Sequence, residues 1–217
     1  MIRTVIYDMD GTLVDSEGAI ALAGKEALVD WGIECKLPDF KPFTGMGDDK
    51  FIGGVAEKYG VPYTTAMKLR AYEIYMEKAD ERVTVYPWSK RLIGFFAARG
   101  LKCAVASASD RVKVLRNIRC IGVDADCFDA VITASEVTRQ KPDPEIFLKA
   151  LAAVGGKASE TLVFEDSLMG VRAAKTAGMK CIATTTSYSA PELYASGADS
   201  VLPDLAALCE IFDIFEI

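Results

Sequence analysis

Two acidic residues stand directly after an apolar run near the N-terminus. Residues 4–7 read TVIY, a pattern typical of a buried strand, and Asp8 and Asp10 follow before a turn at Gly11. One carboxylate of such a pair can attack an electrophilic atom, and the other can transfer a proton. Asp and Gly are also ordinary turn residues, so this segment alone does not separate a catalytic pair from a simple turn.

Further polar residues follow other predicted strands. They are Ser107 and Ala108 after residues 101–106, Lys141 beyond residues 130–133, and Glu165 with Asp166 after residues 161–164. Taken singly, these residues could cap helices or carry solvated charges. The carboxyl ends of parallel strands meet at one edge of a sheet, which is where ligands bind in open α/β folds. We therefore expect the four groups to form one site.

The chemistry that this set favours is phosphoryl transfer. Several carboxylates without a thiolate cluster suit a hard cation, and Mg²⁺ is the natural one. A phosphate group would be repelled by these carboxylates unless positive charge and hydrogen-bond donors compensated. A cation, the Lys141 ammonium, the Ser107 hydroxyl and backbone N–H groups at the strand ends can do this. The predicted partner is a small phosphorylated metabolite.

The composition excludes several other mechanisms. The 217 residues contain no histidine, so Ser-His-Asp and Cys-His nucleophiles, histidine-ligated zinc and phosphohistidine chemistry are excluded. The six cysteines form no CxxC pair, and we expect buried free thiols. A catalytic acid, base or nucleophile must therefore be a carboxylate, a hydroxyl, a thiol or a lysine.

Charge and hydropathy limit the partners and the compartment. The net charge is −6, with no basic cluster, which argues against nucleic acid. No apolar stretch reaches the ~20 residues that span a bilayer, and the N-terminus lacks the pattern of a signal peptide. We expect a cytoplasmic protein with no membrane contact, present as a monomer or weak homodimer. The apolar C-terminal residues 211–217 are predicted to dock on the fold, with a partner surface as the alternative.

Short apolar strands alternate with amphipathic helices after residue 83, which predicts a doubly wound parallel α/β sheet. Residues 1–14 and 84–217 would form this core domain. Residues 15–83 would form an inserted helical domain. The predicted helices span 18–31, 51–59, 65–79, 87–99, 111–118, 144–154 and 168–177, and a further strand spans 180–183. For the helix at 144–154, Asp143 is the expected N-cap and Pro144 the first helical residue.

Four ordered motifs resemble those of the haloacid dehalogenase (HAD) superfamily. They read DMDGTLVDS at 8–16, VASAS at 105–109, KPDP at 141–144 and FEDS at 164–167, the last followed by Gly170. Their order and spacing match across essentially the whole chain. The resemblance implies a Rossmann-like HAD core, and the insertion at 15–83 is similar to the all-helical cap of the β-phosphoglucomutase-like subfamily.

The resemblance also implies roles for the motif residues. Asp8 would be the nucleophile that forms an aspartyl phosphate, and Asp10 the general acid and base. Phosphate would be held by Ser107, Ala108 and Lys141, with Lys141 also catalytic. Mg²⁺ would be bound by Asp8, the carbonyl of Asp10, Glu165 and Asp166.

Two positions in the inserted domain depart from the mutases of this subfamily. Ile20 stands where they carry a histidine, and Asp48 where they carry a phosphate-binding arginine, with Lys50 as an imperfect substitute. Gly45, Asp48 and Lys50 are the candidates for substrate specificity in this domain. The departures favour water as the acceptor, so we expect a phosphatase that acts on a sugar phosphate or a similar metabolite. A β-phosphoglucomutase-type isomerase is the alternative, and a non-catalytic binding module is the third.

Overall fold

The computed structural model describes residues 1–44 and 46–208, and the chain divides into two compact units. The core unit comprises Met1–Val14 and Val85–Ile217, and the helical unit comprises Asp15–Thr84. The chain passes between them at two short strands that pair with each other, β2 (Val14–Asp15) and β3 (Thr84–Val85). Gly45 and the predicted docking segment 211–217 lie outside the described residues.

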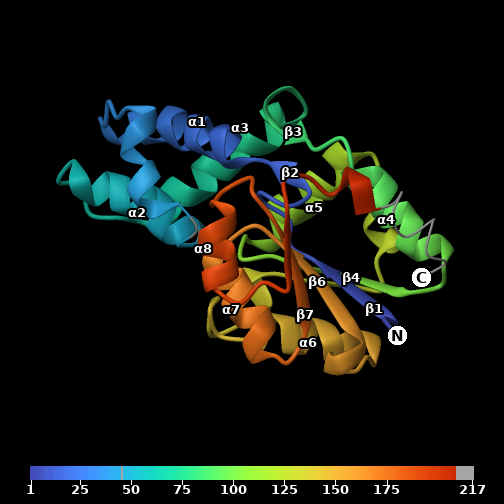
Figure 1. Cartoon of the computed structure of the whole chain (residues 1–217). Helices are drawn as coiled ribbons and strands as arrows, with labels where there is room; N and C mark the ends of the chain where they lie inside the picture. The colour runs from blue at the N-terminus through green and yellow to red at the C-terminus, as the bar shows by residue number, and fades with distance from the viewer. Residues whose placement is uncertain (45, 209–217) are drawn as a thin grey trace. The chain divides into compact units, whose positions relative to one another are not determined.

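The core unit is built on a six-stranded sheet (Figure 1). Its strands are β1 (Thr4–Tyr7), β4 (Lys102–Ala106), β5 (Ala130–Ile132), β6 (Thr161–Glu165), β7 (Lys180–Thr184) and β8 (Ser200–Leu202). The spatial order is β5-β4-β1-β6-β7-β8, and every neighbouring pair is parallel. The predicted α/β fold with a doubly wound parallel sheet is therefore confirmed. It places β1 at the centre, between β4 and β6.

Alternate residues of the strands face helices on opposite sides of the sheet. The helices of the core unit are α4 (Ser89–Ala98), α5 (Arg111–Ile121), α6 (Glu145–Val154), α7 (Leu168–Thr176) and α8 (Ala190–Ala195). Ile6 packs with Phe147 of α6 in one apolar cluster. On the other face Tyr7 stacks on Phe164, whose ring also contacts Phe96 of α4. Burying both faces explains why these strands read as continuous apolar runs.

The helical unit is held together by its own small core. Its helices are α1 (Glu17–Leu28), α2 (Asp48–Lys58) and α3 (Thr65–Arg82), joined by short 3₁₀ segments at Val29–Trp31, Leu37–Asp39 and Lys41–Phe43. Gly24 of α1 leaves room for Phe40 and Ile52, because a Cβ there would lie 2.9 Å and 2.6 Å from their side chains. Ion pairs from Glu26 to Lys78 and Arg82 connect α1 with α3.

Some local predictions need correction. The N-cap of α6 is Pro144 rather than Asp143, because Pro144 lies one residue outside the helix. Asp143 still caps, since its Oδ1 accepts the Glu145 N–H at 3.0 Å. Helix α8 and strand β8 were not predicted. In addition, 3₁₀ segments lie at Ala125–Cys127, Ala134–Glu136 and Ala158–Glu160.

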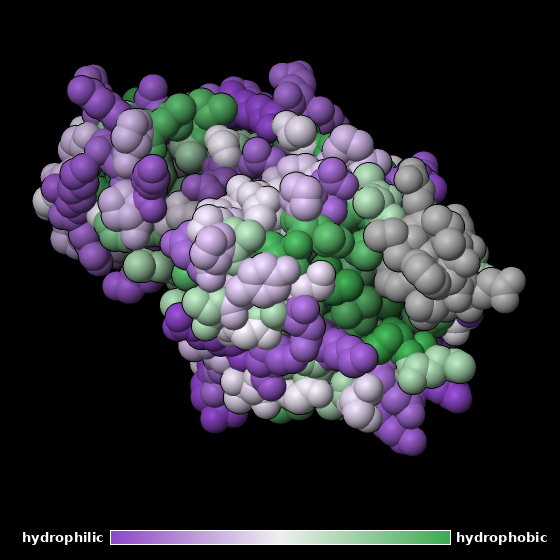
Figure 2. All heavy atoms as spheres, in the orientation of Figure 1, coloured by the Kyte–Doolittle hydropathy of each residue, from purple (hydrophilic) through white to green (hydrophobic). Residues whose placement is uncertain are grey.

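Hydrophilic side chains cover much of the surface in the view of Figure 2, and hydrophobic ones gather in part of the core unit. No helix among the described residues is long and apolar enough to cross a bilayer.

Candidate active site

Three buried carboxyl groups meet at the carboxyl ends of β1 and β6. Asp8 follows β1, and its backbone N–H donates to the Phe164 carbonyl at 2.9 Å, which continues the strand pairing. Glu165 is the last residue of β6 and Asp166 comes next. The three side chains are buried, and one oxygen of each lies within 4.8 Å of the others. This group, Asp8, Glu165 and Asp166, is called the carboxylate cluster below.

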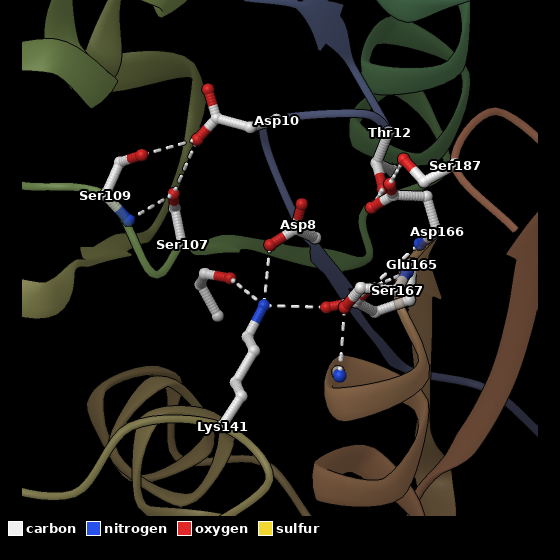
Figure 3. Close-up of polar contacts among 12 residues, drawn as sticks. Asp8, Asp10, Thr12, Ser107, Ser109, Lys141, Glu165, Asp166, Ser167 and Ser187 are labelled. Carbon is white, nitrogen blue, oxygen red and sulfur yellow. Dashed lines mark hydrogen bonds and ion pairs between the residues drawn. The ribbon is translucent and has the colours of Figure 1, made fainter. Parts of the chain in front are cut away.

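Lys141 supplies a positive charge at the cluster (Figure 3). Its Nζ donates to Asp8 Oδ1 at 2.6 Å, to Glu165 Oε1 at 2.7 Å and to the Ala106 carbonyl at 3.1 Å. Burial alone would lower the pKa of Lys141, but the charges on Asp8 and Glu165 raise it above its ordinary value. Lys141 therefore stays protonated. Its ammonium group is hydrogen-bonded to residues at the carboxyl ends of three neighbouring strands, β4, β1 and β6.

The positive charge of Lys141 is not enough to neutralise all three carboxyl groups of the carboxylate cluster when they are ionised. Burial and the neighbouring charge of Glu165 together raise the pKa of Asp166 to about 8, although the hydrogen bond from Ser187 opposes them. Burial also raises the pKa of Asp8 well above its ordinary value, although Lys141 opposes this. A divalent cation would compensate the excess negative charge, and the ligands on offer are all oxygens, as Mg²⁺ prefers. The carboxylate cluster thus fits the predicted cation.

The start of α7 shapes the Glu165 side chain. Glu165 Oε2 accepts the backbone N–H groups of Asp166 and Ser167, both at 2.8 Å, and the Ser167 hydroxyl at 2.9 Å. Ser167 in turn caps α7 by accepting the Gly170 N–H at 3.0 Å. A Cβ on Gly170 would lie only 1.6 Å from Glu165 Oε1. The Glu165 carboxylate therefore occupies the space into which the side chain of any residue other than glycine at position 170 would project.

Replacing Gly170 with alanine should therefore destabilise the protein by about 1–3 kcal/mol, because Glu165 must move away from Lys141. Urea unfolding monitored by circular dichroism measures this change. Gly94→Ala is the matched control, because Gly94 lies in the interior of α4 with no neighbouring atom within 4 Å of an added Cβ. That variant should gain up to about 1 kcal/mol of stability from the better helix propensity of alanine. Equal stabilities for the two variants would contradict the steric argument.

The loop after β1 is anchored through three consecutive carbonyls. Those of Gly11, Thr12 and Leu13 accept hydrogen bonds from Thr186 Oγ1 at 2.5 Å, Trp88 Nε1 at 3.1 Å and Ser89 Oγ at 2.5 Å, respectively. Gly11 has φ +90°, and a Cβ there would meet Asp166 Oδ2 at 2.0 Å. This loop therefore fixes the backbone on which Asp8 and Asp10 stand, and it needs glycine at position 11.

Asp10 points away from the carboxylate cluster, toward the end of β4 (Figure 3). Its Oδ2 accepts hydrogen bonds from Ser109 Oγ at 2.7 Å and Ser107 Oγ at 3.3 Å. Ser107 also accepts the Ser109 N–H at 3.1 Å, across the turn that contains Ala108. The carboxyl groups of Asp8 and Asp10 therefore have different partners, which allows them different chemical roles. Metal binding by the Asp10 carbonyl and phosphate binding by Ser107 and Ala108 stay predictions.

The specificity candidates of the helical unit lie at the start of α2. Asp48 Oδ2 accepts the Tyr72 hydroxyl at 2.7 Å, and Lys50 is exposed. Gly45 lies outside the described residues. Neighbouring Asp49 accepts hydrogen bonds from Tyr63 and Lys68, so it is part of the internal structure of this unit.

Sequence reasoning missed several polar partners in the core unit. Thr12 and Ser187 donate to Asp166, and Ser167 donates to Glu165. Ser187 could have been found, because a run of hydroxyl residues follows the strand predicted at 180–183. Lys113 and Asn117, which contact Asp10, lie four residues apart on α5, a spacing that indicates a shared helix face but not what it faces.

Solved structures with the same fold are found among known proteins. CbbY from Rhodobacter sphaeroides in complex with phosphate matches with a TM-score of 0.85 and 26% identity, and the match covers 96% of both chains. The same protein, in a mutant form, has also been solved in complex with xylulose-(1,5)bisphosphate. The likeness therefore extends over both units of the chain.

Sequence comparisons give the family. The family model for haloacid dehalogenase-like hydrolase matches residues 5–184, so the chain belongs to that family. Protein SUPPRESSOR OF QUENCHING 1, chloroplastic, from Arabidopsis thaliana is 38% identical over 208 residues, 94% of this chain. A bifunctional riboflavin kinase/FMN phosphatase from the same plant is 29% identical over 93% of this chain. The chain spans only 20% and 53% of the lengths of these two relatives.

Proposed function

We propose that this protein is a Mg²⁺-dependent phosphatase that hydrolyses a small phosphorylated metabolite through an aspartyl phosphate on Asp8. The observation that carries the proposal is the position of Asp8, which is buried, held by Lys141 and flanked by Glu165 and Asp166. A buried carboxylate in contact with a lysine and two more carboxyl groups is a costly arrangement. With a cation and a phosphoryl group bound, the carboxylates would bind the cation, and Lys141 would offset the negative charge of the phosphoryl group.

The proposed reaction has two steps. In the first, a carboxylate oxygen of Asp8 attacks phosphorus, the ester P–O bond breaks, and Asp10 gives its proton to the leaving oxygen. In the second, water attacks the phosphorus of the aspartyl phosphate while Asp10 takes the proton back. The P–O bond to Asp8 then breaks and releases phosphate. Lys141 holds Asp8 in place and offsets the negative charge that collects around phosphorus in both steps.

The proposed cation would be held by Asp8, Asp166 and the Asp10 carbonyl, with Glu165 beside it. When bound, Mg²⁺ supplies charge neutralisation that lets an anionic carboxylate approach an anionic phosphate. Thr12 and Ser187 donate to Asp166 and so orient the carboxyl group toward the site. These two hydroxyls would keep the ligand positioned whether or not the cation is present.

The relatives' ligands support a phosphorylated sugar or sugar-like compound as the substrate. CbbY has been solved with phosphate and with xylulose-(1,5)bisphosphate, and one relative is named for FMN phosphatase activity. The helical unit would select among such compounds. Ile20 is buried there and has no ionisable group, and Asp48 is a carboxyl residue hydrogen-bonded to Tyr72. Neither position therefore offers the histidine or the phosphate-binding arginine of the mutases in this subfamily. This favours water as the acceptor.

Removal of the cation tests the proposal. Release of phosphate from an aryl phosphate should require added Mg²⁺, disappear with excess chelator and return when Mg²⁺ is restored in excess. A malachite-green assay measures the phosphate, and a panel of sugar phosphates then ranks substrates by kcat/KM. Full activity in the presence of chelator would contradict the role of the cation.

The same assay separates the alternatives. With β-glucose 1-phosphate and a bisphosphate primer, free phosphate is the expected product. Glucose 6-phosphate as the main product would show a mutase and overturn the proposal. Absence of turnover across the whole panel with Mg²⁺ present would favour the non-catalytic alternative.

A further inference from the structure

Lys113 and Asn117 of α5 contact the second catalytic candidate, Asp10. The Lys113 Nζ lies 3.3 Å from Asp10 Oδ1, and Asn117 Nδ2 donates to the same oxygen at 3.1 Å. Lys113 also donates to Ser109 Oγ at 2.9 Å, and Ser109 in turn donates to Asp10 Oδ2. Both side chains are buried, with exposures of 4% for Lys113 and 0% for Asn117. They stand outside the four family motifs.

These contacts restrict the Asp10 side chain to one orientation. Ser107 and Ser109 contact its Oδ2, and Lys113 and Asn117 contact its Oδ1. All four belong to the segment from the end of β4 through α5. Residues 113 and 117 are spaced by four, so they lie along one face of α5, and Ser109 lies just before that helix. Val114 and Ile118 of the same helix are fully buried, which fixes the helix against the core.

A lysine in this position is costly for the fold alone. Burying an ammonium group loses its hydration, and an apolar side chain of similar size would commonly be as stable or more so. A functional reason for Lys113 therefore has to come from what it contacts. It contacts Asp10 and Ser109, and Ser109 itself contacts Asp10, so its contacts lead to this carboxyl group both directly and through one hydroxyl.

We propose that Lys113 and Asn117 are positioning residues that hold the Asp10 carboxyl group where it exchanges a proton with the leaving oxygen and with water. This inference rests on the proposed function, because it assigns a purpose to Asp10 within it. Neither residue needs to touch substrate. Proton transfer depends steeply on the distance and direction between donor and acceptor, so a displaced Asp10 transfers protons poorly.

The test compares aryl phosphates whose phenol leaving groups differ in basicity. Lys113→Met should lower kcat/KM by about 10- to 100-fold for basic phenols, which need a proton, and much less for acidic phenols. Asn117→Ala keeps the ion pair and should show the same trend with a loss of up to about tenfold. If Lys113→Met does not fold, as judged by circular dichroism, the Asn117→Ala series decides by itself.

Two further variants separate positioning from a general structural effect. In an Asp10→Asn background, which has lost the acid, adding Lys113→Met should cost little more, since Lys113 acts through Asp10. Val114→Ala perturbs the packing of α5 without touching Asp10 and should leave the leaving-group dependence unchanged. A uniform loss across all phenols, or a full additional loss in the Asp10→Asn background, would overturn the inference.

The proposed function and the positioning role of Lys113 can be tested separately. Undiminished turnover of the same phenyl esters by Asp8→Asn would overturn the nucleophile, and with it the purpose assigned to Lys113. An inactive Asp8→Asn protein together with a Lys113→Met protein that matches wild type would overturn only the positioning role.

Discussion

Asp8→Asn should lower phosphate release by about 10⁴-fold or more, without loss of folded structure. The amide has nearly the same size as the carboxyl group, and its oxygen can still accept a hydrogen bond from Lys141. It is a much weaker nucleophile and does not form the acyl phosphate. Asp8 is therefore expected to be the position where the smallest change of side-chain volume gives the largest loss of activity.

The same substitution should stabilise the metal-free protein at neutral pH. Burial raises the pKa of Asp8 well above its ordinary value, which means that the charged form is unfavourable in the folded state. A neutral amide avoids that cost. Urea unfolding in the presence of chelator should therefore give a higher midpoint for Asp8→Asn than for wild type, while the phosphate assay gives almost no activity.

Asp199→Asn is the matched control for this prediction. Burial raises the pKa of Asp199, but its hydrogen bonds with Lys175 and the Cys181 N–H outweigh this, so the pKa is lowered. Losing this carboxylate should reduce stability slightly and leave the activity intact. Turnover by Asp8→Asn at the wild-type rate would refute the nucleophile. A lower unfolding midpoint for Asp8→Asn would refute the account of its electrostatics.

The second large effect concerns pH. The stability of the metal-free protein should fall as pH rises between about 5 and 7.5. The pKa of Asp166 is raised from 3.8 to about 8 on folding, so the folded state binds more protons than the unfolded state in this range. Stability then decreases with pH by about 1.4 kcal/mol per unit for each extra proton. The contribution is fully present below pH 3.8 and lost as the pH passes about 8.

The absence of histidine makes this measurement unusually clean. Histidine normally dominates proton uptake between pH 5 and 8, and this chain contains none. Most of the slope in that window should therefore come from the carboxylate cluster. Saturating Mg²⁺ should flatten it, because a cation replaces the protons on its ligands.

Urea unfolding at several pH values, once with chelator and once with Mg²⁺, measures how the free energy of unfolding depends on pH in the two conditions. Asp166→Asn should reduce the slope in chelator and abolish most of the response to Mg²⁺. A metal-free stability that is constant or rises from pH 5 to 7.5 would contradict the raised pKa of the carboxylate cluster.

The sequence predicted the strands that carry the site because burial on both sides leaves an unmistakable apolar run. The first strand was predicted at 4–7 and lies at Thr4–Tyr7, and the motif residues after it lie where parallel strands end. The short helix at Ala190–Ala195 and the strand at Ser200–Leu202 were missed. Both are half-exposed and brief, so they lack the periodicity that longer elements show.

The surroundings of Asp10 could not be predicted for a different reason. Lys113 and Asn117 share a helix face, but the sequence does not say which strand end that face approaches. That depends on how α5 rotates about its axis when Val114 and Ile118 become buried. A lysine within an apolar helix pattern is normally expected at the surface. Only the packed structure reveals that Lys113 meets the carboxylate of Asp10, which lies far earlier in the chain.

The central place of β1 in the sheet has a consequence for biosynthesis. The strand that carries Asp8 precedes the other strands of its sheet in the chain, yet Thr4 pairs with Lys102 on one side and with Thr161 on the other. Two of the hydroxyls that secure its loop and its acidic neighbour, Thr186 and Ser187, are translated later still. Asp8 is therefore translated before its partners and reaches its finished environment only after Ser187 has been made, since long-range contacts must wait for both partners.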